Sequence, residues 1–247
     1  MKIDDSKNKQ NLQELIDTQD FVPHISVDCA IFGYQNGILK ILLLKYHDLD
    51  LWSLPGGFVF EDEDLSEAAA RVLYERTHLS DIFMDQFHTF GAKNRTENNV
   101  HQILLRNKGI KVPPDHWIFQ RFITVAYCSL IDYNLVDTFP DAFNETRAWF
   151  EVDNLPKMAF DHDQIIPKAV QHLRKNIDTQ IVASKLLPEK FTMKELQTVY
   201  ETVLGEKFRR NNFQRKILGL NSLERLEKFY DGSANKAPYL YRFADHI

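Results

Sequence analysis

The chain has 247 residues, a formal net charge of −5 and a hydrophobic content of 44%. This hydrophobic content is ample for a folded core and excludes a chain that is disordered throughout. The negative charge argues against a nucleic-acid-binding coat over the whole surface. Acidic residues outnumber basic residues before Thr192, whereas basic residues outnumber acidic residues after it. This asymmetry favours a basic module that follows an acidic one.

The cysteines and the N-terminal residues indicate the cellular compartment of the protein. Cys29 and Cys128 each lie inside an apolar run, so we expect reduced core thiols and no disulfide. No apolar stretch is long enough to cross a bilayer, and the N-terminal residues lack the apolar core of a signal peptide. We therefore expect a cytoplasmic protein with no membrane partner.

The first elements have clear local signals. Residues 1–22 are expected to form a tail or a short helix. Two apolar runs joined by Gln35-Asn36-Gly37 predict a β-hairpin. The sequence LWSLPGGFVF predicts a strand that ends in a Pro-Gly-Gly turn. Apolar spacing predicts a helix over 65–77, with His78 in a left-handed conformation at its C-terminal end.

Alternating strands then resume on either side of a polar segment. Residues 87–93 and 122–131 are predicted strands, and 95–120 between them are interpreted as an inserted surface segment with at most one short helix. A strand near 146–151 and a helix over 163–176 follow, with Pro167 in the first two turns of that helix. This order predicts an α+β first domain over residues 23–180.

The C-terminal segment, residues 181–247, has a different pattern. Thr192 and Glu195 form a capping box for a helix that runs to Val203. A second helix over 211–218 and two strands around a turn at 231–238 complete the pattern. This order is typical of a winged helix-turn-helix domain.

The stretch from Gly57 to Leu79 raises the question of catalysis. Positions 72, 75 and 76 share one face of the predicted helix and hold valine, glutamate and arginine. A magnesium-dependent diphosphate hydrolase needs several carboxylates on such a face. We therefore predict no catalytic residue, no metal and no cofactor. Glu63 and Arg71 are interpreted as a structural ion pair.

This stretch resembles the Nudix box, Gly-x5-Glu-x7-Arg-Glu-U-x-Glu-Glu-x-Gly-U, in which U is a bulky apolar residue. The matching residues are Gly57, Glu63, Arg71, Leu73, Glu75 and Leu79, and the preceding Leu-Pro-Gly is also typical of the family. Val72, Arg76 and His78 depart from the box. In the family, two of these positions hold residues that serve as the catalytic base or as metal ligands.

With its C-terminal module, the chain resembles the Nudix-related transcriptional regulators (NrtR-like proteins), and especially the sugar-responsive branch that includes arabinose regulators of Bacteroidetes. The resemblance implies a Nudix α/β/α sandwich followed by a winged helix. It also implies a homodimer that binds double-stranded operator DNA and releases it when ADP-ribose or a sugar binds. The departures from the box favour a pentose or related sugar as the effector, and a repressor of sugar catabolism genes.

The second helix of the C-terminal module is the predicted DNA reader. Residues 207–216 include five basic residues and no acid. Arginine and asparagine hydrogen-bond to guanine and adenine edges in the major groove. The alternative is a solvated basic face, with Phe208, Phe213 and Ile217 packed inward in either case. The candidate DNA-binding residues are Thr192, Lys194, Arg209, Arg210, Asn211, Asn212, Arg215, Lys216 and Lys236.

The effector pocket is predicted less sharply. Arg95 suits a phosphate or a sugar hydroxyl, but it is equally consistent with a surface loop. Trp52 could stack on a sugar, although a core position is favoured. Asp161-His162-Asp163 is interpreted as a helix N-cap with a hydrogen-bonded histidine, and not as a metal site. The candidate effector-binding residues are Trp52, Gly56, Gly57, Glu75, Lys93 and Arg95.

Two other functions remain open from the sequence. The first is a Mg²⁺-dependent Nudix hydrolase of an ADP-ribose-like compound, with Glu61, Asp62 or Glu97 as the metal ligands. The second is a nucleotide-binding interaction module that does not bind DNA.

Overall fold

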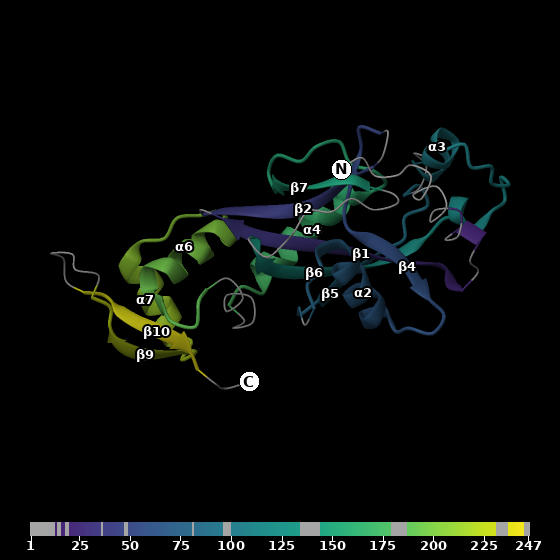
Figure 1. The fold of residues 1–247 in the computed structure, drawn as a ribbon. Helices are drawn as coiled ribbons and strands as arrows, with labels where there is room; N and C mark the ends of the chain where they lie inside the picture. The colour runs from purple at the N-terminus through teal and green to yellow at the C-terminus, as the bar shows by residue number, and fades with distance from the viewer. Residues whose placement is uncertain are drawn as a thin grey trace.

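The structure is a computed structural model that describes residues 13, 16–17, 20–35, 37–46, 49–80, 82–95, 100–133, 144–178, 187–230 and 237–244. These residues form a large lobe built on a mixed sheet and a smaller C-terminal lobe (Figure 1). The strands of the large lobe are β1 (Phe21–Gln35), β2 (Ile38–Tyr46), β3 (Trp52–Ser53), β4 (Gly56–Phe60), β5 (Asp85–Phe90), β6 (Ile123–Asp132) and β7 (Asn144–Glu151). Its helices are α2 (Leu65–Thr77), α3 (Val100–Asn107), the 3-10 helix η1 (Trp117–Phe119) and α4 (His162–Lys175).

The 15-residue strand β1 organises the sheet of the large lobe. It pairs in parallel with β6 along most of its length, and antiparallel with β4 near its start and with β2 near its end. Its side chains alternate between the two faces, so that Cys29 packs under α2 and Ala30 packs under α4. The large lobe is therefore an α/β/α sandwich, as predicted.

Most local predictions for this lobe are confirmed. The hairpin pairs Gln35 with Ile38, and Gly37 has a φ of 79°, whereas Asn36 lies outside the described residues. Asp64 caps α2 through a capping box with Glu67. His78 ends α2 in the left-handed region, with a φ of 58°. The free thiols of Cys29 and Cys128 lie on opposite faces of the sheet.

The predicted Pro-Gly-Gly turn is wrong in its placement, because Gly56 and Gly57 begin β4 and do not end a strand. Both positions require glycine because neighbours approach them closely. A Cβ atom on Gly56 would lie 2.4 Å from Oδ1 of Asp28, its partner across the ladder, and one on Gly57 would lie 2.8 Å from Cγ2 of Val72. The two glycines thus let β1 and α2 approach β4.

The 95–120 segment is more than a surface insertion. Its helix α3 and the 3-10 helix η1 bury apolar side chains, among them Leu105, Ile110 and Ile118. Ile16, from the segment predicted to be a tail or short helix, is helical and packs into the same cluster. The polar composition of the segment concealed this packing.

The C-terminal lobe contains α6 (Met193–Leu204), α7 (Arg210–Gly219) and a small sheet of β8 (Phe191–Thr192), β9 (Leu223–Lys228) and β10 (Tyr239–Phe243). Thr192 and Glu195 form the predicted capping box at the start of α6. Phe213 and Ile217 of α7 are buried against α6. This arrangement is the predicted winged helix-turn-helix.

The two lobes meet at the tip of the β1–β2 hairpin, which points toward α6 (Figure 1). The hydroxyl of Thr202 lies 2.9 Å from the carbonyl oxygen of Gly37, and Nε of Arg174 in α4 donates to the carbonyl of Val203 at 2.9 Å. Tyr200 donates its hydroxyl to the carbonyl of Ile177. The C-terminal lobe is thus held by the sheet and by α4.

Candidate functional site

The large lobe contains a cavity of about 180 Å³ at the start of β1 and β4. This volume is several times the roughly 30 Å³ that a water molecule occupies in the liquid, so the cavity can hold a ligand. One wall belongs to α2 and carries Arg71, Glu75 and Arg76. Aromatic side chains form much of the rest, namely Phe21, Tyr46, Phe58, Phe60, Phe122 and Phe160.

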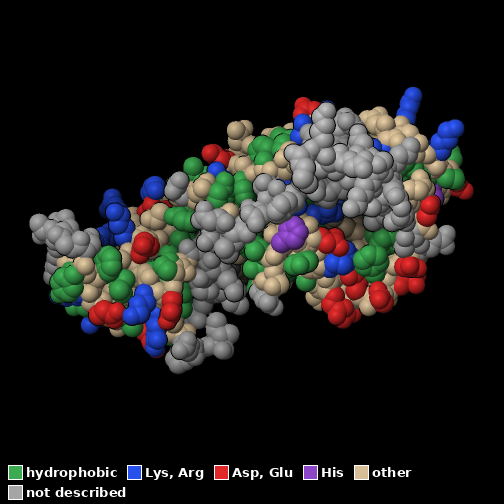
Figure 2. All heavy atoms as spheres, viewed as in Figure 1, with side chains coloured by type: hydrophobic (Ala, Val, Ile, Leu, Met, Phe, Trp, Pro, Cys, Tyr) green, Lys and Arg blue, Asp and Glu red, His purple; other side chains and the backbone are tan. Residues whose placement is uncertain are grey.

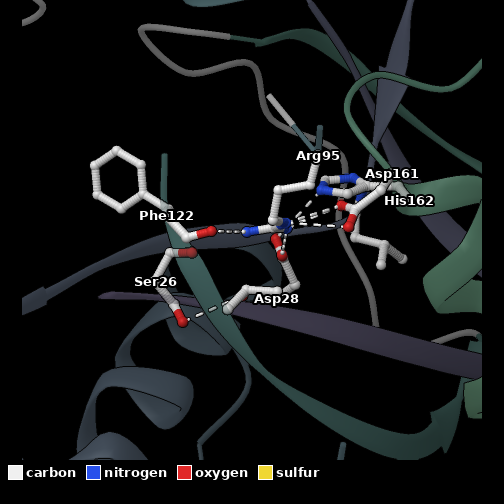
Figure 3. A network of polar contacts seen from close by, with 8 residues as sticks. Ser26, Asp28, Arg95, Phe122, Asp161 and His162 are labelled. Carbon is white, nitrogen blue, oxygen red and sulfur yellow. Dashed lines mark hydrogen bonds and ion pairs between the residues drawn. The ribbon is translucent and has the colours of Figure 1, made fainter. Parts of the chain in front are cut away.

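A buried charge network forms the floor of this cavity (Figure 3). The guanidinium of Arg95 donates to both carboxylate oxygens of Asp161 at 2.9 to 3.2 Å and to Oδ2 of Asp28 at 3.3 Å. It also donates to the carbonyl of Phe122 at 3.1 Å. Only 5% of Arg95 is exposed, and the two carboxylates compensate the cost of removing its charge from water.

His162 completes the network as a neutral ring. The backbone N–H of Leu54 donates to its Nδ1 at 2.9 Å, so the ring proton lies on Nε2, which is 3.4 Å from Oδ1 of Asp28. Burial lowers the pKa of His162. The histidine is hydrogen-bonded as predicted. The predicted side-chain cap is wrong, because Asp161 starts α4 without a side-chain cap and uses its carboxylate for Arg95.

On the α2 wall, two carboxylates of the Nudix-like stretch, those of Glu63 and Glu75, accept hydrogen bonds from Arg71. Arg71 donates to Glu63 at 2.6 and 2.9 Å, to Glu75 at 3.1 Å and to the carbonyl of Phe58 at 2.7 Å. Its guanidinium stacks 4.3 Å from the ring centroid of Phe60. Hydrogen bonds from Arg71 lower the pKa of Glu63. The predicted ion pair is confirmed, and it positions Arg71 in the wall.

The structure places the predicted effector residues in two groups. Gly56, Gly57, Glu75 and Arg95 line the cavity. Trp52 packs edge-on against Phe150 in the core, and Lys93 is exposed in the loop before Arg95, so neither lines the cavity.

Sequence reasoning missed several lining residues. Asp28 had a usable signal, because an acid inside the apolar run of a central strand needs a buried partner. The aromatic residues of the wall had no such signal, since aromatics are equally common in cores.

The ligands suggested for a hydrolase lie elsewhere or outside the described residues. Glu61 and Asp62 are exposed and do not line the cavity, and Glu97 is outside the described part of the chain. The exposed acids near the start of α2 form the acidic surface visible at the lower right of Figure 2.

The candidate DNA residues of α7 are exposed. Arg209, Arg210, Asn211, Asn212 and Arg215 all face solvent, and Arg215 donates to Asn212 at 3.4 Å. Asn211 and Arg215 are one turn apart on the side of α7 opposite Phe213 and Ile217. These exposed side chains can reach base edges if α7 enters a major groove.

The four remaining predicted contacts lie in other settings or outside the described residues. Lys216 is exposed, but its ammonium pairs with Asp178 at 3.0 Å beside the ring of Tyr200, so it faces the lobe junction and not the outward side of α7. The hydroxyl of Thr192 is engaged by Glu195 of the capping box, whereas Lys194 is exposed at the start of α6. Lys236 lies outside the described residues.

The network predicts a large stability cost when Arg95 is replaced. The Arg95→Leu variant leaves two buried carboxylates without their partner, and we expect it to lower the free energy of unfolding by about 3–5 kcal/mol in urea denaturation. The matched control is Lys93→Ala, which removes an exposed cation two residues away and should change stability by less than about 0.5 kcal/mol. Equal effects of the two substitutions would contradict the network.

A second prediction concerns the stability of the protein at acidic pH. Burial lowers the pKa of His101, in the cavity wall, from 6.5 to about 4. Between these values the unfolded chain binds more protons than the folded chain, so stability is lost as the pH falls from 6.5 towards 4. The loss from this group is on the order of 3 kcal/mol.

The change that tests this pH dependence is His101→Gln. It should flatten the dependence of unfolding free energy on pH in this window, though not completely, because burial also lowers the pKa of His162. The exposed His88→Gln should leave the slope as it is. An unaltered slope in His101→Gln would show that His101 titrates normally.

Comparison with known proteins agrees with this arrangement. The NUDIX domain profile matches residues 22–169, and the profile of the NrtR DNA-binding winged helix domain matches residues 183–243. The chain is 29% identical over 230 residues to the "ADPR responsive transcriptional repressor NtrR" of Acinetobacter baylyi, covering 90% of this chain and 82% of that protein.

Two solved structures share the fold along nearly the whole chain. The Shewanella oneidensis NrtR structure complexed with a 27mer DNA is 26% identical, covers 89% of this chain and 93% of that chain, and superposes with a TM-score of 0.65. A MutT/nudix family protein from Enterococcus faecalis is 19% identical with a TM-score of 0.65, covering 99% of this chain and all of that chain. No helix in the described part is long and apolar enough to span a bilayer. The chain thus belongs to the NUDIX domain family, and its C-terminal DNA-binding domain makes it an NrtR-like Nudix and winged-helix regulator.

Proposed function

We propose that this regulator is a homodimeric repressor whose Nudix domain has no hydrolase activity and binds ADP-ribose or a closely related nucleotide, and that this ligand releases DNA. The observation that carries the proposal is the α2 wall, in which arginine engages the carboxylates that a metal would need. The name of the Acinetobacter baylyi relative supports both the repressor and the ADP-ribose effector.

The composition of the cavity supports a nucleotide. Phe21, Phe58 and Phe122 offer ring faces on which an adenine can stack. Arg71 and Arg76 bring guanidinium groups to the same cavity, and guanidinium is suited to the oxygens of a diphosphate. The floor adds the carboxylate of Asp28, which can accept hydrogen bonds from ribose hydroxyls. A ligand with a base, a diphosphate and a sugar would match the aromatic rings, the arginines and the carboxylate, respectively.

A pentose or a related sugar is the alternative effector. The polar floor suits sugar hydroxyls, but a free sugar would leave the arginines of α2 and much of the aromatic wall without a partner. Control of sugar catabolism genes belongs to this alternative. The two effectors are distinguished by which of them binds the protein and releases the DNA duplex.

The case against hydrolysis comes from the contacts of Glu63 and Glu75. Both accept hydrogen bonds from Arg71, and Arg76 adds a second positive charge on the same face of α2. A magnesium ion would have to displace Arg71 and tolerate Arg76. The retained groups favour binding a polyanionic ligand over cleaving it.

A continuous path leads from the cavity to the lobe that carries α6 and α7. Ser26 and Asp28 of β1 line the cavity, and the same strand ends at the hairpin whose Gly37 carbonyl lies against Thr202 of α6. A shift of β1 on ligand binding would therefore change the position of α6 and α7. In a dimer, this change alters the spacing of the two recognition helices and hence their fit to one operator.

The effector prediction is tested by thermal shift and by fluorescence anisotropy on a duplex from the region upstream of the protein's own gene. ADP-ribose should raise the melting temperature and release the duplex, because a ligand stabilises the state that it binds. Intact ADP-ribose should be recovered after incubation with Mg²⁺. Release of the duplex by a pentose but not by ADP-ribose would establish the sugar alternative. Rapid Mg²⁺-dependent hydrolysis of ADP-ribose would contradict the proposal that the Nudix domain has no hydrolase activity.

The DNA contact is tested by Arg215→Ala. Loss of a base contact should weaken specific binding by about 1–3 kcal/mol and relax sequence preference at one position. Lys194→Ala should weaken binding to all DNA sequences. It should also reduce the slope of log affinity against log salt concentration by about one, which corresponds to the loss of one phosphate contact. The charge-matched control is Lys168→Ala, an exposed lysine of α4 in the other lobe. Wild-type affinity in Arg215→Ala would exclude α7 as the reader.

The path itself is tested by Thr202→Val. This substitution nearly preserves side-chain volume and removes a hydroxyl that lies 2.9 Å from the Gly37 carbonyl and 2.8 Å from the Thr198 carbonyl of α6. We expect DNA and ADP-ribose each to bind almost normally, while the coupling between them falls by roughly 0.5–2 kcal/mol. The control is Thr198→Val, one turn earlier, whose hydroxyl donates only within α6 to Lys194. Undiminished coupling in Thr202→Val would mean that the ligand signal takes another route.

A further inference from the structure

Apart from the cavity, three side chains with different metal-binding atoms converge on the α4 face of the sheet. They are Asp85 of β5, Cys128 of β6 and His172 of α4, and their ligand atoms all lie within 4.8 Å of one another. Among the described residues, no other group of three histidine, cysteine or acidic side chains is so close. The DNA-binding function described above does not use this cluster.

The fold brings these groups together by two separate contacts. Asp85 and Cys128 are directly opposite each other in the antiparallel β5–β6 ladder, so their side chains leave the sheet on the same face. Helix α4 packs over that face and presents His172, whose Nε2 lies 2.7 Å from Oδ2 of Asp85. The cluster therefore rests on the sheet register and on helix packing, both of which are fixed by the core.

We propose that Asp85, Cys128 and His172 bind a zinc ion. Thiolate, imidazole and carboxylate together are the ligands of zinc and similar transition metals, whereas magnesium and calcium prefer oxygen alone. Asp85 is 45% exposed on its side chain and His172 is 23% exposed, so solvent reaches the cluster from one side. Three protein ligands with one open position are the usual number for a zinc site that keeps a water molecule.

The surroundings fit a metal better than a simple ion pair. An Asp85–His172 pair alone does not require a sulfur atom at its base, yet Cys128 is buried directly against it. Zinc would replace the proton between the carboxylate and the imidazole and would displace the proton of the thiol. The ring of His172 is already oriented, because Phe87 packs 5.7 Å from it and the Asn176 amide nitrogen lies beside it, 3.3 Å from Nδ1 and 3.1 Å from Nε2.

The other cysteine provides an internal comparison. Cys29 is equally buried, but it lies on the α2 face of the sheet, where its sulfur is 3.9 Å from the carbonyl oxygen of Ala69. It belongs to no group of metal-binding side chains among the described residues. A metal bound through thiolate should therefore depend on Cys128 and be indifferent to Cys29.

The experiment uses the purified full chain after treatment with a chelator, titrated with Co²⁺ as a spectroscopic substitute for zinc and then with Zn²⁺ against a chromophoric chelator. We expect one Co²⁺ per chain, a thiolate-to-cobalt charge-transfer band in the near ultraviolet, and displacement of Co²⁺ by Zn²⁺. The Cys29→Ser variant should keep the band, and Cys128→Ser should lose it.

Two more variants test the remaining ligands without disturbing the core. Asp85→Asn and His172→Gln change partly exposed side chains, and each should weaken Zn²⁺ binding at least about tenfold while circular dichroism and thermal unfolding stay as in the unmodified chain. The proposal is overturned by an absent band in the unmodified chain, by a band that survives in Cys128→Ser, or by unchanged affinity in both Asp85→Asn and His172→Gln.

Discussion

The buried guanidinium of Arg95 is the interaction on which the cavity depends. It joins β1 through Asp28, the start of α4 through Asp161, and the segment before β6 through the carbonyl of Phe122. A charge removed from water is tolerated only where opposite charges and hydrogen bonds match it, and this cluster supplies them. Because the three segments it joins border the cavity, this one side chain links them where the ligand would bind.

The sequence predicted the elements well wherever neighbours a few residues apart decide the structure. The capping box at Thr192, the left-handed His78 and the inward face of α7 are all of this kind. Arg95 could not be assigned in the same way, since its two carboxylate partners lie 66 and 67 residues away along the chain. Its sequence context left a ligand contact and a surface loop equally open, and its burial is revealed only when β1 and the start of α4 lie beside it.

The 95–120 segment and Lys216 illustrate the same limit. The polar residues of α3 outnumber its buried ones, so the composition suggested a surface, although Leu104 and Leu105 are buried. Helical periodicity correctly predicted that Phe213 packs inward. It could not predict that Lys216 pairs with Asp178, because Asp178 lies 38 residues earlier in the chain, just after α4. Composition and period describe one element, whereas the site arises from contacts between elements.

The proposed control of DNA binding by the cavity rests on the altered Nudix helix and the long first strand. On α2, Val72 closes against Gly57 and Arg71 holds Glu63, so the wall is ordered by packing and by an internal ion pair. From Asp28 to Gln35, β1 covers roughly 23 Å at about 3.3 Å per residue. Because β6 pairs with this strand along most of that length, the proposed coupling needs the strand to carry a displacement at the cavity to the hairpin that contacts α6.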